Sequence, residues 1–466
     1  MSRALVWGME SSALYFIPLG GSGEIGMNLN VYAWQGKLLV IDCGITFERR
    51  PGGATEIHMP DPTWLARRSD QIAGLVLTHA HEDHIGAVTA MWPQLRCPVY
   101  ATPFTATILR AKLAAARLVM GVPLREVRPG GATSVGPFGI RFIGITHSTA
   151  ECQSVVIETD HGRVLHTGDW KLDPAPMVGP KTDAAAFRAL GSSGGVLAAV
   201  SDSTNATRPG RSGSEGDVRK HLMERCGGVK GRLVVSCFAS NIARIATLLE
   251  VAAAHDRHPV LMGRSLHRMV GAARASGYLD SSYSFVPVEH SGFLPRDRVM
   301  LICTGTQGEP RAAMGRLSTD SFRHMMLDPG DTAVFSSKII PGNEQPIALL
   351  HRRLSEQGVA VVSEAEEPEV HVSGHPCRDE LADFYDWVKP RCVVPVHGTP
   401  RHLEAHAELA RQLGIDDVQV RNGDVLQLAP GEPRVIDRVR AGRIPRPDVE
   451  KDEHFRRSRG NRRRNG

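Results

Sequence analysis

The fold of this chain is decided by one stretch, Leu77-Thr78-His79-Ala80-His81-Glu82-Asp83-His84-Ile85-Gly86. Three histidines and two acidic residues lie within positions 79–84. The apolar run before it predicts a buried strand, and the segment after it has helical character. The cluster therefore sits on a strand-to-helix loop, where imidazole and carboxylate groups converge and suit divalent ions such as zinc or manganese. The alternative is a solvated loop that is rich in histidine by chance.

The motif H-x-H-x-D-H resembles the metallo-β-lactamase superfamily. In that superfamily the first two histidines bind one metal ion, and the aspartate and the last histidine bind a second. The resemblance implies that His79 and His81 belong to site one, and that Asp83 and His84 belong to site two. It specifies a hydrolase with two metal ions but does not specify the substrate.

Length and composition fit an ordinary globular protein. The 466 residues suggest two to three domains, and 42% of them are hydrophobic. No apolar run approaches the ~20 residues of a membrane span, and we expect no signal peptide and no membrane contact. The eight cysteines are scattered without a C-x-x-C pair. They predict reduced, mostly structural thiols in a cytoplasmic protein.

Positive charge gathers at the end of the chain. Residues 436–466 contain 11 Lys/Arg and 5 Asp/Glu, a net charge of +6, whereas the whole chain carries +5. The rest of the chain is therefore close to neutral. We expect a disordered basic tail, which either contacts a polyanion or is simply solvated.

A glycine-rich stretch near the start, Gly21-Ser22-Gly23-Glu24-Ile25-Gly26, matches G-x-G-x-x-G. A dinucleotide site needs a helix next, but residues 29–34 and 37–41 read as two consecutive strands. The glycines are therefore expected to permit close approach to another backbone or to a ligand.

Later strands deliver further candidate ligands. The superfamily has a histidine as the third ligand of site one and a bridging aspartate, and His147 and Asp169 follow strands in the expected order. The resemblance also implies that Asp42 supports the histidine loop through hydrogen bonds without binding metal. A simple turn aspartate is the alternative for Asp42. His166 lies inside a strand, and we expect it to pack or to support a ligand.

A second α/β block begins where a plain metallo-β-lactamase domain would finish. Strands are predicted at 233–238, 259–262, 299–303 and 332–336, with Ser240 as a helix N-cap. Repeated strand-loop-helix units predict a parallel sheet with ligands at the strand ends. The loops suit phosphate groups, although helix capping explains any one of them alone. The chain then returns through a strand ending at 370–375 and another at 392–396, which delivers His397.

An insert at this point resembles the β-CASP nucleases, and the match to the ribonuclease J family runs from about residue 16 to about residue 428. The matching stretches are Leu19-Gly20-Gly21 through Gly26, Asp202-Ser203-Thr204-Asn205-Ala206 with Arg208-Pro209-Gly210, Phe238-Ala239-Ser240-Asn241, Gly263-Arg264-Ser265, Gly305-Thr306-Gln307-Gly308-Glu309-Pro310, Pro341-Gly342-Asn343-Glu344, Ser373-Gly374-His375 and Pro395-Val396-His397-Gly398.

The resemblance implies an αββα sandwich over residues 14–205 and 351–435. The β-CASP domain, with a parallel sheet, would be inserted at 206–350, and the basic tail would follow at 436–466. The family commonly carries a further C-terminal domain associated with dimerisation. We expect a short Arg-rich tail in its place, which leaves a homodimer and the balance of endonuclease and exonuclease action open.

The resemblance also implies roles within the site. His397 would complete metal site two, Asp202 would be the acidic residue of the first β-CASP motif, and His375 would bind the scissile phosphate and protonate the leaving 3′ oxygen. Asp83 would hold the proton of the attacking water. The residues expected near RNA phosphates are Ser240, Arg264, Ser373 and His375. The implied cofactors are two divalent ions per chain, Zn²⁺ first and Mn²⁺ or Mg²⁺ as alternatives.

The implied activity is 5′-to-3′ exoribonuclease action on single-stranded 5′-monophosphate RNA, with some endonuclease activity. A DNA-directed β-CASP nuclease is one alternative. A small-molecule hydrolase such as a thioesterase or lactonase is another, and the insert and His375 speak against it. A metal-free RNA-binding scaffold is the non-enzymatic alternative, which the complete set of ligand positions disfavours.

Overall fold

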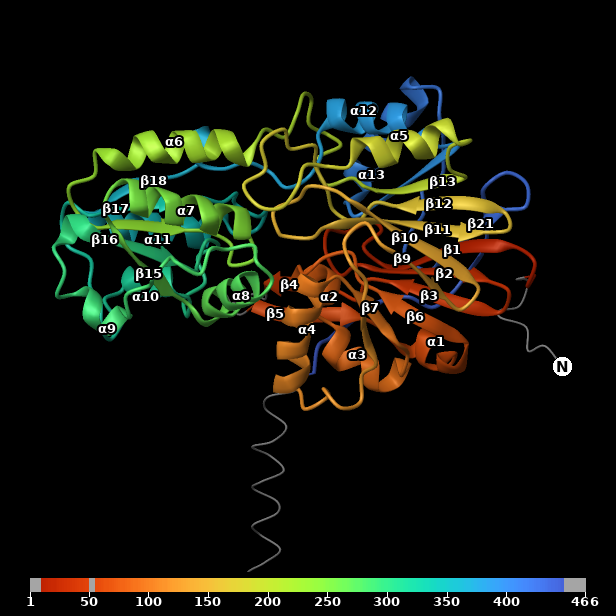
Figure 1. The fold of residues 1–466 in the computed structure, drawn as a ribbon, viewed down its shortest axis with the longest axis horizontal. Coiled ribbons are helices and arrows are strands. Elements are labelled where there is room, and N and C mark those ends of the chain that lie inside the picture. The colour runs from red at the N-terminus through yellow and green to blue at the C-terminus, as the bar shows by residue number, and fades with distance from the viewer. Residues whose placement is uncertain (1–9, 50–54, 448–466) are drawn as a thin grey trace, which may run out of the picture.

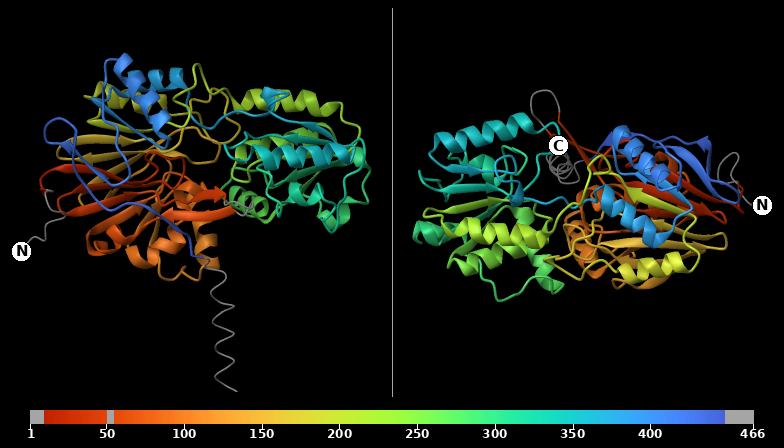
Figure 2. Two further views of the ribbon diagram at one scale, coloured as in Figure 1. Left: turned by 180° about the vertical axis from the view of Figure 1, so that it is seen from behind. Right: turned by 90° about the horizontal axis from the view of Figure 1, so that it is seen from above.

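The computed structural model describes residues 10–49 and 55–447. Its larger part is a pair of facing β-sheets with helices on both outer faces, and its smaller part is an α/β domain at one end of the molecule (Figure 1). The two further views in Figure 2 show the same arrangement, with the inserted domain beside the sandwich. The expected αββα sandwich with an α/β insert is confirmed.

The first sheet of the sandwich has eight strands in the order β22-β21-β1-β2-β3-β6-β7-β8. The strands are β1 (Leu14–Gly20), β2 (Leu29–Trp34), β3 (Lys37–Ile41), β6 (Ile72–Val76), β7 (Val99–Ala101), β8 (Leu124–Glu126), β21 (Asp424–Ala429) and β22 (Arg434–Arg438). The outer face of this sheet is covered by the helices α1 (Thr63–Ala66), α3 (Val88–Leu95) and α4 (Pro103–Ala115). Because β3, β6 and β7 are parallel, the loops after them leave from one edge of the sheet.

The second sheet has seven strands in the order β20-β19-β13-β12-β11-β10-β9. The strands are β9 (Ala132–Val135), β10 (Phe138–Gly144), β11 (Gln153–Thr159), β12 (Gly162–His166), β13 (Ala198–Asp202), β19 (Cys392–Val396) and β20 (Asp416–Asp417). The outer face of this sheet is covered by the helices α5 (Ala184–Ser192), α12 (Arg378–Val388) and α13 (Pro400–Gln412). Strands β12, β13 and β19 are parallel, so Asp169, Asp202 and His397 lie at or just beyond the same edge.

Apolar side chains from both sheets fill the space between them. Phe16, Tyr32, Phe142, Val200 and Leu426 are all fully or almost fully buried in this core. Strands β1 and β2 are buried along their whole length because one face meets the other sheet and the opposite face meets helices. Burying each such side chain stabilises the fold by roughly 1.5–3 kcal/mol. This core fixes the edge at which the candidate ligands gather.

The inserted domain contains a five-stranded parallel sheet in the order β15-β16-β14-β17-β18. Its elements are α6 (Glu215–Gly227), β14 (Leu233–Ser236), α7 (Ile242–Ala254), β15 (His258–Met262), α8 (Arg264–Ala275), α9 (Val288–Ser291), β16 (Val299–Cys303), α10 (Ala313–Leu317), β17 (Thr332–Phe335), α11 (Glu344–Glu356) and β18 (Ala360–Val362). The parallel sheet predicted from the repeated strand-loop-helix units is confirmed. The predicted N-cap is wrong, because Asn241 rather than Ser240 accepts the backbone N–H of Arg244, at 2.8 Å.

The prediction of a strand at residues 370–375 is also wrong. A short 3₁₀ helix, Pro368–Val370, is followed by an extended loop. The loop crosses from the insert to the sandwich, so its carbonyls accept hydrogen bonds from side chains instead of a neighbouring strand. Arg244 donates to the carbonyl of Val370, and Asn205 donates to that of His375, each at 3.0 Å.

The start of the expected disordered tail is part of the fold. Strand β22 spans the boundary at residue 436, and β23 (Arg443–Pro445) pairs with β5 (Thr55–Pro60) in a small sheet with β4 (Thr46–Arg49). Arg446 then donates from its backbone to the carbonyl of Ile57 at 2.8 Å, and from its side chain to that of Gly86 at 3.2 Å. The rest of the predicted tail, residues 448–466, lies outside the described residues.

All eight cysteines are buried and unpaired. Among the described residues, the structure has no helix with the length and hydropathy needed to cross a membrane.

Candidate metal centre

The seven predicted ligands come together at one end of the sandwich. Their donor atoms form two groups, each within 4.8 Å, and Asp169 belongs to both. The first group is His79, His81, His147 and Asp169, and the second is Asp83, His84, Asp169 and His397. A third group adds Asp202 and His375 to Asp169 and His397. The structure thus brings together the expected ligands and the two residues expected to act beside them.

The histidine loop is shaped by its packing against the loop that follows β3. A single helical turn, α2 (Glu82–Ile85), carries Asp83 and His84 toward the centre. Cys43 N–H donates to the carbonyl of His84 at 2.7 Å, and Ile45 N–H donates to that of Glu82 at 3.0 Å. Between them, a Cβ on Gly44 would lie 1.6 Å from the carbonyl oxygen of Asp83. Position 44 therefore accepts only glycine if the loop is to keep its place.

We expect Gly44→Ala to displace the histidine loop, lower metal binding and destabilise the fold by about 1–3 kcal/mol, because the added methyl must push backbone aside. Gly271→Ala is the matched control, since a Cβ there, inside α8, meets open space. That change should instead stabilise the helix by about 1 kcal/mol. Thermal unfolding and metal content of the two variants check this, and equal behaviour would contradict it.

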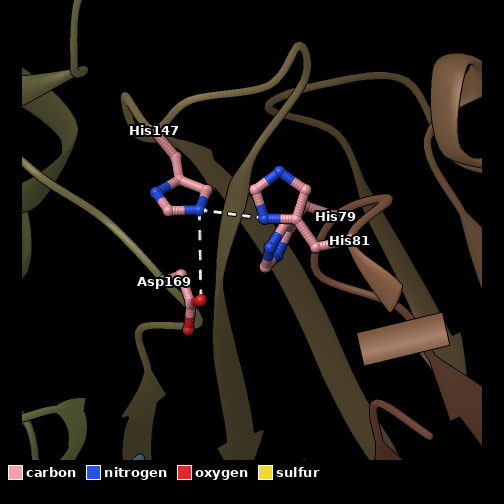
Figure 3. A group of neighbouring side chains, drawn as sticks. All are labelled: His79, His81, His147 and Asp169. Carbon is pink, nitrogen blue, oxygen red and sulfur yellow. Dashed lines mark hydrogen bonds and ion pairs between the residues drawn. The ribbon is translucent and has the colours of Figure 1, made fainter. Parts of the chain in front are cut away.

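Site one has buried ring nitrogens without partners. His147 Nε2 lies 3.1 Å from His81 Nδ1 and 3.9 Å from Asp169 Oδ2, and Figure 3 shows these side chains facing one another. The Nε2 atoms of His79 and His81 are buried and have no hydrogen-bond partner. An unmet buried polar group costs about 1–3 kcal/mol, whereas a metal ion would use such nitrogens as ligands. The donor set therefore fits a metal ion.

Site two gathers two histidines and a second carboxylate around Asp169. His84 Nε2 lies 3.2 Å from Asp169 Oδ2 and 3.6 Å from Asp83 Oδ2. His397 lies 2.8 Å from Asp169 through Nδ1 and 3.4 Å from Asp83 through Nε2. Both ring nitrogens of His397 are buried and lack a well-aligned hydrogen bond. Two carboxylates and two imidazoles are a suitable set for a second divalent ion.

Polar partners behind the ligands fix the ring orientations. Asp42 Oδ2 lies 2.7 Å from His84 Nδ1, and the backbone N–H and hydroxyl of Thr78 both donate to the same carboxylate. Asp42 therefore has the hydrogen bonds expected of it. His147 Nδ1 donates to the carbonyl of Gly374 at 2.6 Å, which leaves Nε2 for the centre. His166 instead lies 3.1 Å from the hydroxyl of Tyr32 between the sheets, as a packing residue.

Burial and charge set the protonation of the centre. Burial lowers the pKa of His79 and His147 well below the usual range and that of His81 to about 4, so these rings are neutral, the form that binds metal. Burial would raise the pKa of Asp169, but His397 and His84 lower it well below its usual range. The carboxylates thus stay charged, as metal ligation requires.

His375 and Asp202 form a pair beside site two. His375 Nδ1 lies 2.7 Å from Asp202 Oδ2 and 4.0 Å from Asp169 Oδ2. The other oxygen of Asp202 accepts from the backbone N–H and hydroxyl of Thr204. Burial would lower the pKa of His375, but Asp202 raises it above the usual value. The side chain of His375 is 21% exposed, and the Asp202 carboxylate favours its charged form.

Three further residues, Ser240, Arg264 and Ser373, are expected near RNA phosphates, and they lie outside the two groups of candidate ligands. Ser373 shapes the loop of His375, because its hydroxyl accepts from Asn205 at 2.8 Å and from the backbone N–H of His375 at 3.2 Å. Ser240 and Arg264 lie after β14 and β15 of the insert, and Arg264 is an exposed first residue of α8. Phosphate binding by all three stays a prediction.

Two features of the amino-terminal loop complete the centre. Asn28 lies 3.1 Å from His84 Nε2 and donates to the carbonyl of Asp83, a role that no sequence pattern marks. The glycine-rich loop approaches other backbone closely, as expected. The carbonyl of Gly21 accepts the N–H of His397 at 2.6 Å. A strand follows this loop, which speaks against a dinucleotide site.

Three family models match the chain, described as "Beta-lactamase superfamily domain" over residues 38–189, "Ribonuclease J, beta-CASP domain" over 230–354 and "Zn-dependent metallo-hydrolase RNA specificity domain" over 367–420. The structure is also similar to a solved protein of unknown function from Enterococcus faecalis V583, with a TM-score of 0.62 and 16% identity over 91% of this chain and 100% of that one. At this identity the likeness concerns the fold alone.

Curated relatives cover most of the chain. A protein named Ribonuclease J from Sinorhizobium meliloti is 44% identical over 93% of this chain and 78% of its own length. Another from Mycolicibacterium smegmatis is 40% identical over 91% of this chain and 76% of its own length. Taken with the two-sheet sandwich, its β-CASP insert and the cluster around Asp169, these matches show that the chain belongs to the ribonuclease J family.

Proposed function

We propose that this chain is a metal-dependent ribonuclease that hydrolyses phosphodiester bonds with two metal ions. The observation that carries the proposal is Asp169, shared between two groups of histidine and aspartate donors. Within these groups, His79, His81 and His397 have buried nitrogens without hydrogen-bond partners. RNA as the substrate is supported by the names of the relatives and of the model over residues 367–420. Zn²⁺ is the expected ion, with Mn²⁺ or Mg²⁺ as alternatives.

Ions held by the two groups would supply the positive charge that polarises phosphoryl oxygens and makes a bound water more acidic. The protein's own residues orient the reaction around that charge. Asp169 lies between the groups, so it fixes their separation. Asp83 is 29% exposed, unlike the buried His84 beside it, and its carboxylate is placed to accept the proton of an attacking water.

His375 is proposed as the proton donor to the leaving 3′ oxygen. Asp202 holds its Nδ1 at 2.7 Å, which leaves Nε2 free for the substrate. Because the Asp202 carboxylate favours the charged imidazole, His375 carries the proton that the leaving group needs. Asp202 therefore acts through His375, as an orienting partner.

For the substrate, we propose 5′-monophosphate single-stranded RNA, degraded from its 5′ end, with some endonuclease cleavage. Ser240, Arg264 and Ser373 are the residues proposed to contact its phosphates. Ser240 and Arg264 follow the carboxyl ends of the parallel strands β14 and β15, where backbone and side-chain donors suit anions, and Ser373 lies in the loop that carries His375. Arg264 adds an exposed guanidinium that can bind phosphate in two places at once.

One set of denaturing gels tests the proposal. It compares RNA with a 5′ monophosphate, RNA with a 5′ triphosphate, RNA blocked internally, and DNA of the same sequence. Rapid release of nucleotides from 5′-monophosphate RNA is expected, with slower cleavage of the triphosphate form. Equal or faster cleavage of DNA would favour a DNA-directed nuclease. Hydrolysis of thioesters or lactones without cleavage of any nucleic acid would favour a small-molecule hydrolase.

The basic tail supplies a separate prediction. Residues 449–466, which lie outside the described residues, contain 7 Lys/Arg and 3 Asp/Glu. Deleting them should weaken RNA binding and flatten its dependence on salt, because phosphate contacts release counterions. Turnover at saturating RNA should persist, since the candidate ligands all lie before residue 398. Binding titrations at several salt concentrations measure this, and an unchanged salt slope would show that the tail does not contact RNA.

A further inference from the structure

The chain passes between the sandwich and the inserted domain twice, once outward and once on its return. Both connections are contacted by the buried guanidinium of Arg244. Arg244 lies in the first turn of α7 and is 0% exposed. Its Nε and Nη2 atoms donate to the two carboxylate oxygens of Glu215, each at 3.1 Å. Its Nη1 atom donates to the carbonyls of Ser336 and Val370, each at 3.0 Å. The side chain thus ties together the start of α6, the end of β17 and the chain that returns to the sandwich.

That returning chain, residues 370–375, is here called the return linker, and it carries His375. Its first residue, Val370, is held from the insert, where the hydroxyl of Ser336 also donates to its carbonyl at 2.7 Å. Its far end is held from the sandwich, where Asn205 donates to the hydroxyl of Ser373 and His147 donates to the carbonyl of Gly374. The direction in which His375 points therefore depends on anchors at both ends of the linker.

Glu215, the partner of Arg244, is connected through further buried contacts to the candidate metal centre. The backbone N–H of Glu215 donates to Asp173 at 2.9 Å, and the hydroxyl of Ser214 donates to the same carboxylate at 2.6 Å. Asp173 pairs with the buried Lys171 at 3.0 Å, and Lys171 follows Asp169 by two residues. A continuous set of buried contacts thus runs from the loop of Asp169, through Glu215 and Arg244, to the return linker.

We propose that Arg244 is a positioning residue that aims His375 at the scissile phosphate. The inference rests on the proposed ribonuclease function. Arg244 is fully buried, so it does not contact RNA, and it differs in this from the exposed Arg264. A buried ion pair adds little net stability over apolar packing, so a geometric role explains its place at this junction. A displacement of about 1 Å in a reacting group can cost roughly 10²-fold in rate.

The test separates proton donation from every other effect on the enzyme. Two RNAs of the same sequence are compared, one natural and one with the scissile 3′ oxygen replaced by sulfur. A thiolate leaves without being protonated, so the sulfur RNA does not need the donor, whereas the natural RNA does. The ratio of the two single-turnover rates therefore reports on protonation of the leaving group, and the His375 variant calibrates it. His375→Ala is the reference, and its ratio should shift strongly toward the sulfur RNA.

Three variants change the anchor by degrees. Arg244→Met removes the guanidinium, and Arg244→Lys keeps the charge opposite Glu215 but not the fork that also reaches Val370. Ser336→Ala keeps the guanidinium but removes the second donor to Val370, together with a hydroxyl that accepts from Arg244 Nη1. Both Arg244 variants should lose roughly 10²-fold on natural RNA and about two-fold or less on sulfur RNA, with metal content unchanged. Ser336→Ala should shift the ratio in the same direction by less.

The matched control is Arg219→Met. Arg219 on α6 pairs with Glu250 on α7, so it joins the same two helices, but it is half-exposed and does not contact the linker. Its rate ratio should equal that of the parent. Equal losses on both RNAs in the Arg244 variants, or no loss, would overturn the inference. If Arg244→Met does not fold, Arg244→Lys and Ser336→Ala decide it in the same way. A parent enzyme that cleaves no RNA would refute the proposed function instead.

Discussion

Replacing Asp169 by alanine is expected to abolish RNA cleavage and to remove bound metal from both groups of ligands. Asp169 lies 2.8 Å from His397, 3.2 Å from His84 and 3.9 Å from His147, so it is the one carboxylate common to both groups. Without it, the buried imidazoles lose the negative charge that stabilises positive charge between them. Elemental analysis of the purified variant, beside single-turnover cleavage, measures both losses.

The same experiment includes two further variants. His81→Ala should lower bound metal and abolish cleavage, because its unpartnered Nε2 belongs to the first group. Asp160→Ala is the control. Asp160 is an exposed aspartate in the hairpin turn between β11 and β12, and Asp169 follows the second of these strands. This variant should keep full metal content and rate. Full metal occupancy with normal turnover in Asp169→Ala or His81→Ala would show that these residues are not ligands.

The second large effect is expected for His375→Ala, which should keep both metal ions and the fold while cleavage falls by roughly 10²–10⁴-fold. All seven proposed ligands remain, and His375 contacts Asp202 more closely than it contacts Asp169. RNA binding should weaken only modestly, through one lost phosphate contact. Metal stoichiometry beside single-turnover cleavage tests this prediction.

Because His375 also belongs to a group of possible metal donors with Asp169, Asp202 and His397, the variant has an informative alternative outcome. Loss of an ion would make His375 a ligand and would remove one residue from the proposed seven. Cleavage at the parent rate would make it a packing histidine. His290→Ala, an exposed histidine of α9 in the insert, controls for the loss of any imidazole.

The candidate metal centre could be predicted from sequence because its parts lie in local patterns. The histidine loop follows a buried strand, and strands 29–34, 37–41, 299–303 and 392–396 have the predicted bounds. Each is an apolar run that is buried along most of its length, so the local signal and the tertiary environment agree. The positions of the ligands at strand ends follow from those bounds.

The junction between the domains could not be predicted in this way. The sequence predicts a strand at residues 370–375, yet their carbonyls accept hydrogen bonds from Arg244, Asn205 and His147, which are far away in sequence. The same holds for β23, whose pairing partner β5 lies almost 400 residues earlier. Local patterns carry no information on such partners, so the anchors of His375 are visible only in the structure.

We expect RNA cleavage to require two ions held around Asp169. Metal-free protein can be titrated with Zn²⁺ or Mn²⁺ while bound ions and single-turnover cleavage of 5′-monophosphate RNA are followed together. Cleavage should rise with the second equivalent and reach its maximum when two ions are bound per chain. Full cleavage with one ion or none bound, or two ions bound without any cleavage of RNA, would contradict this account.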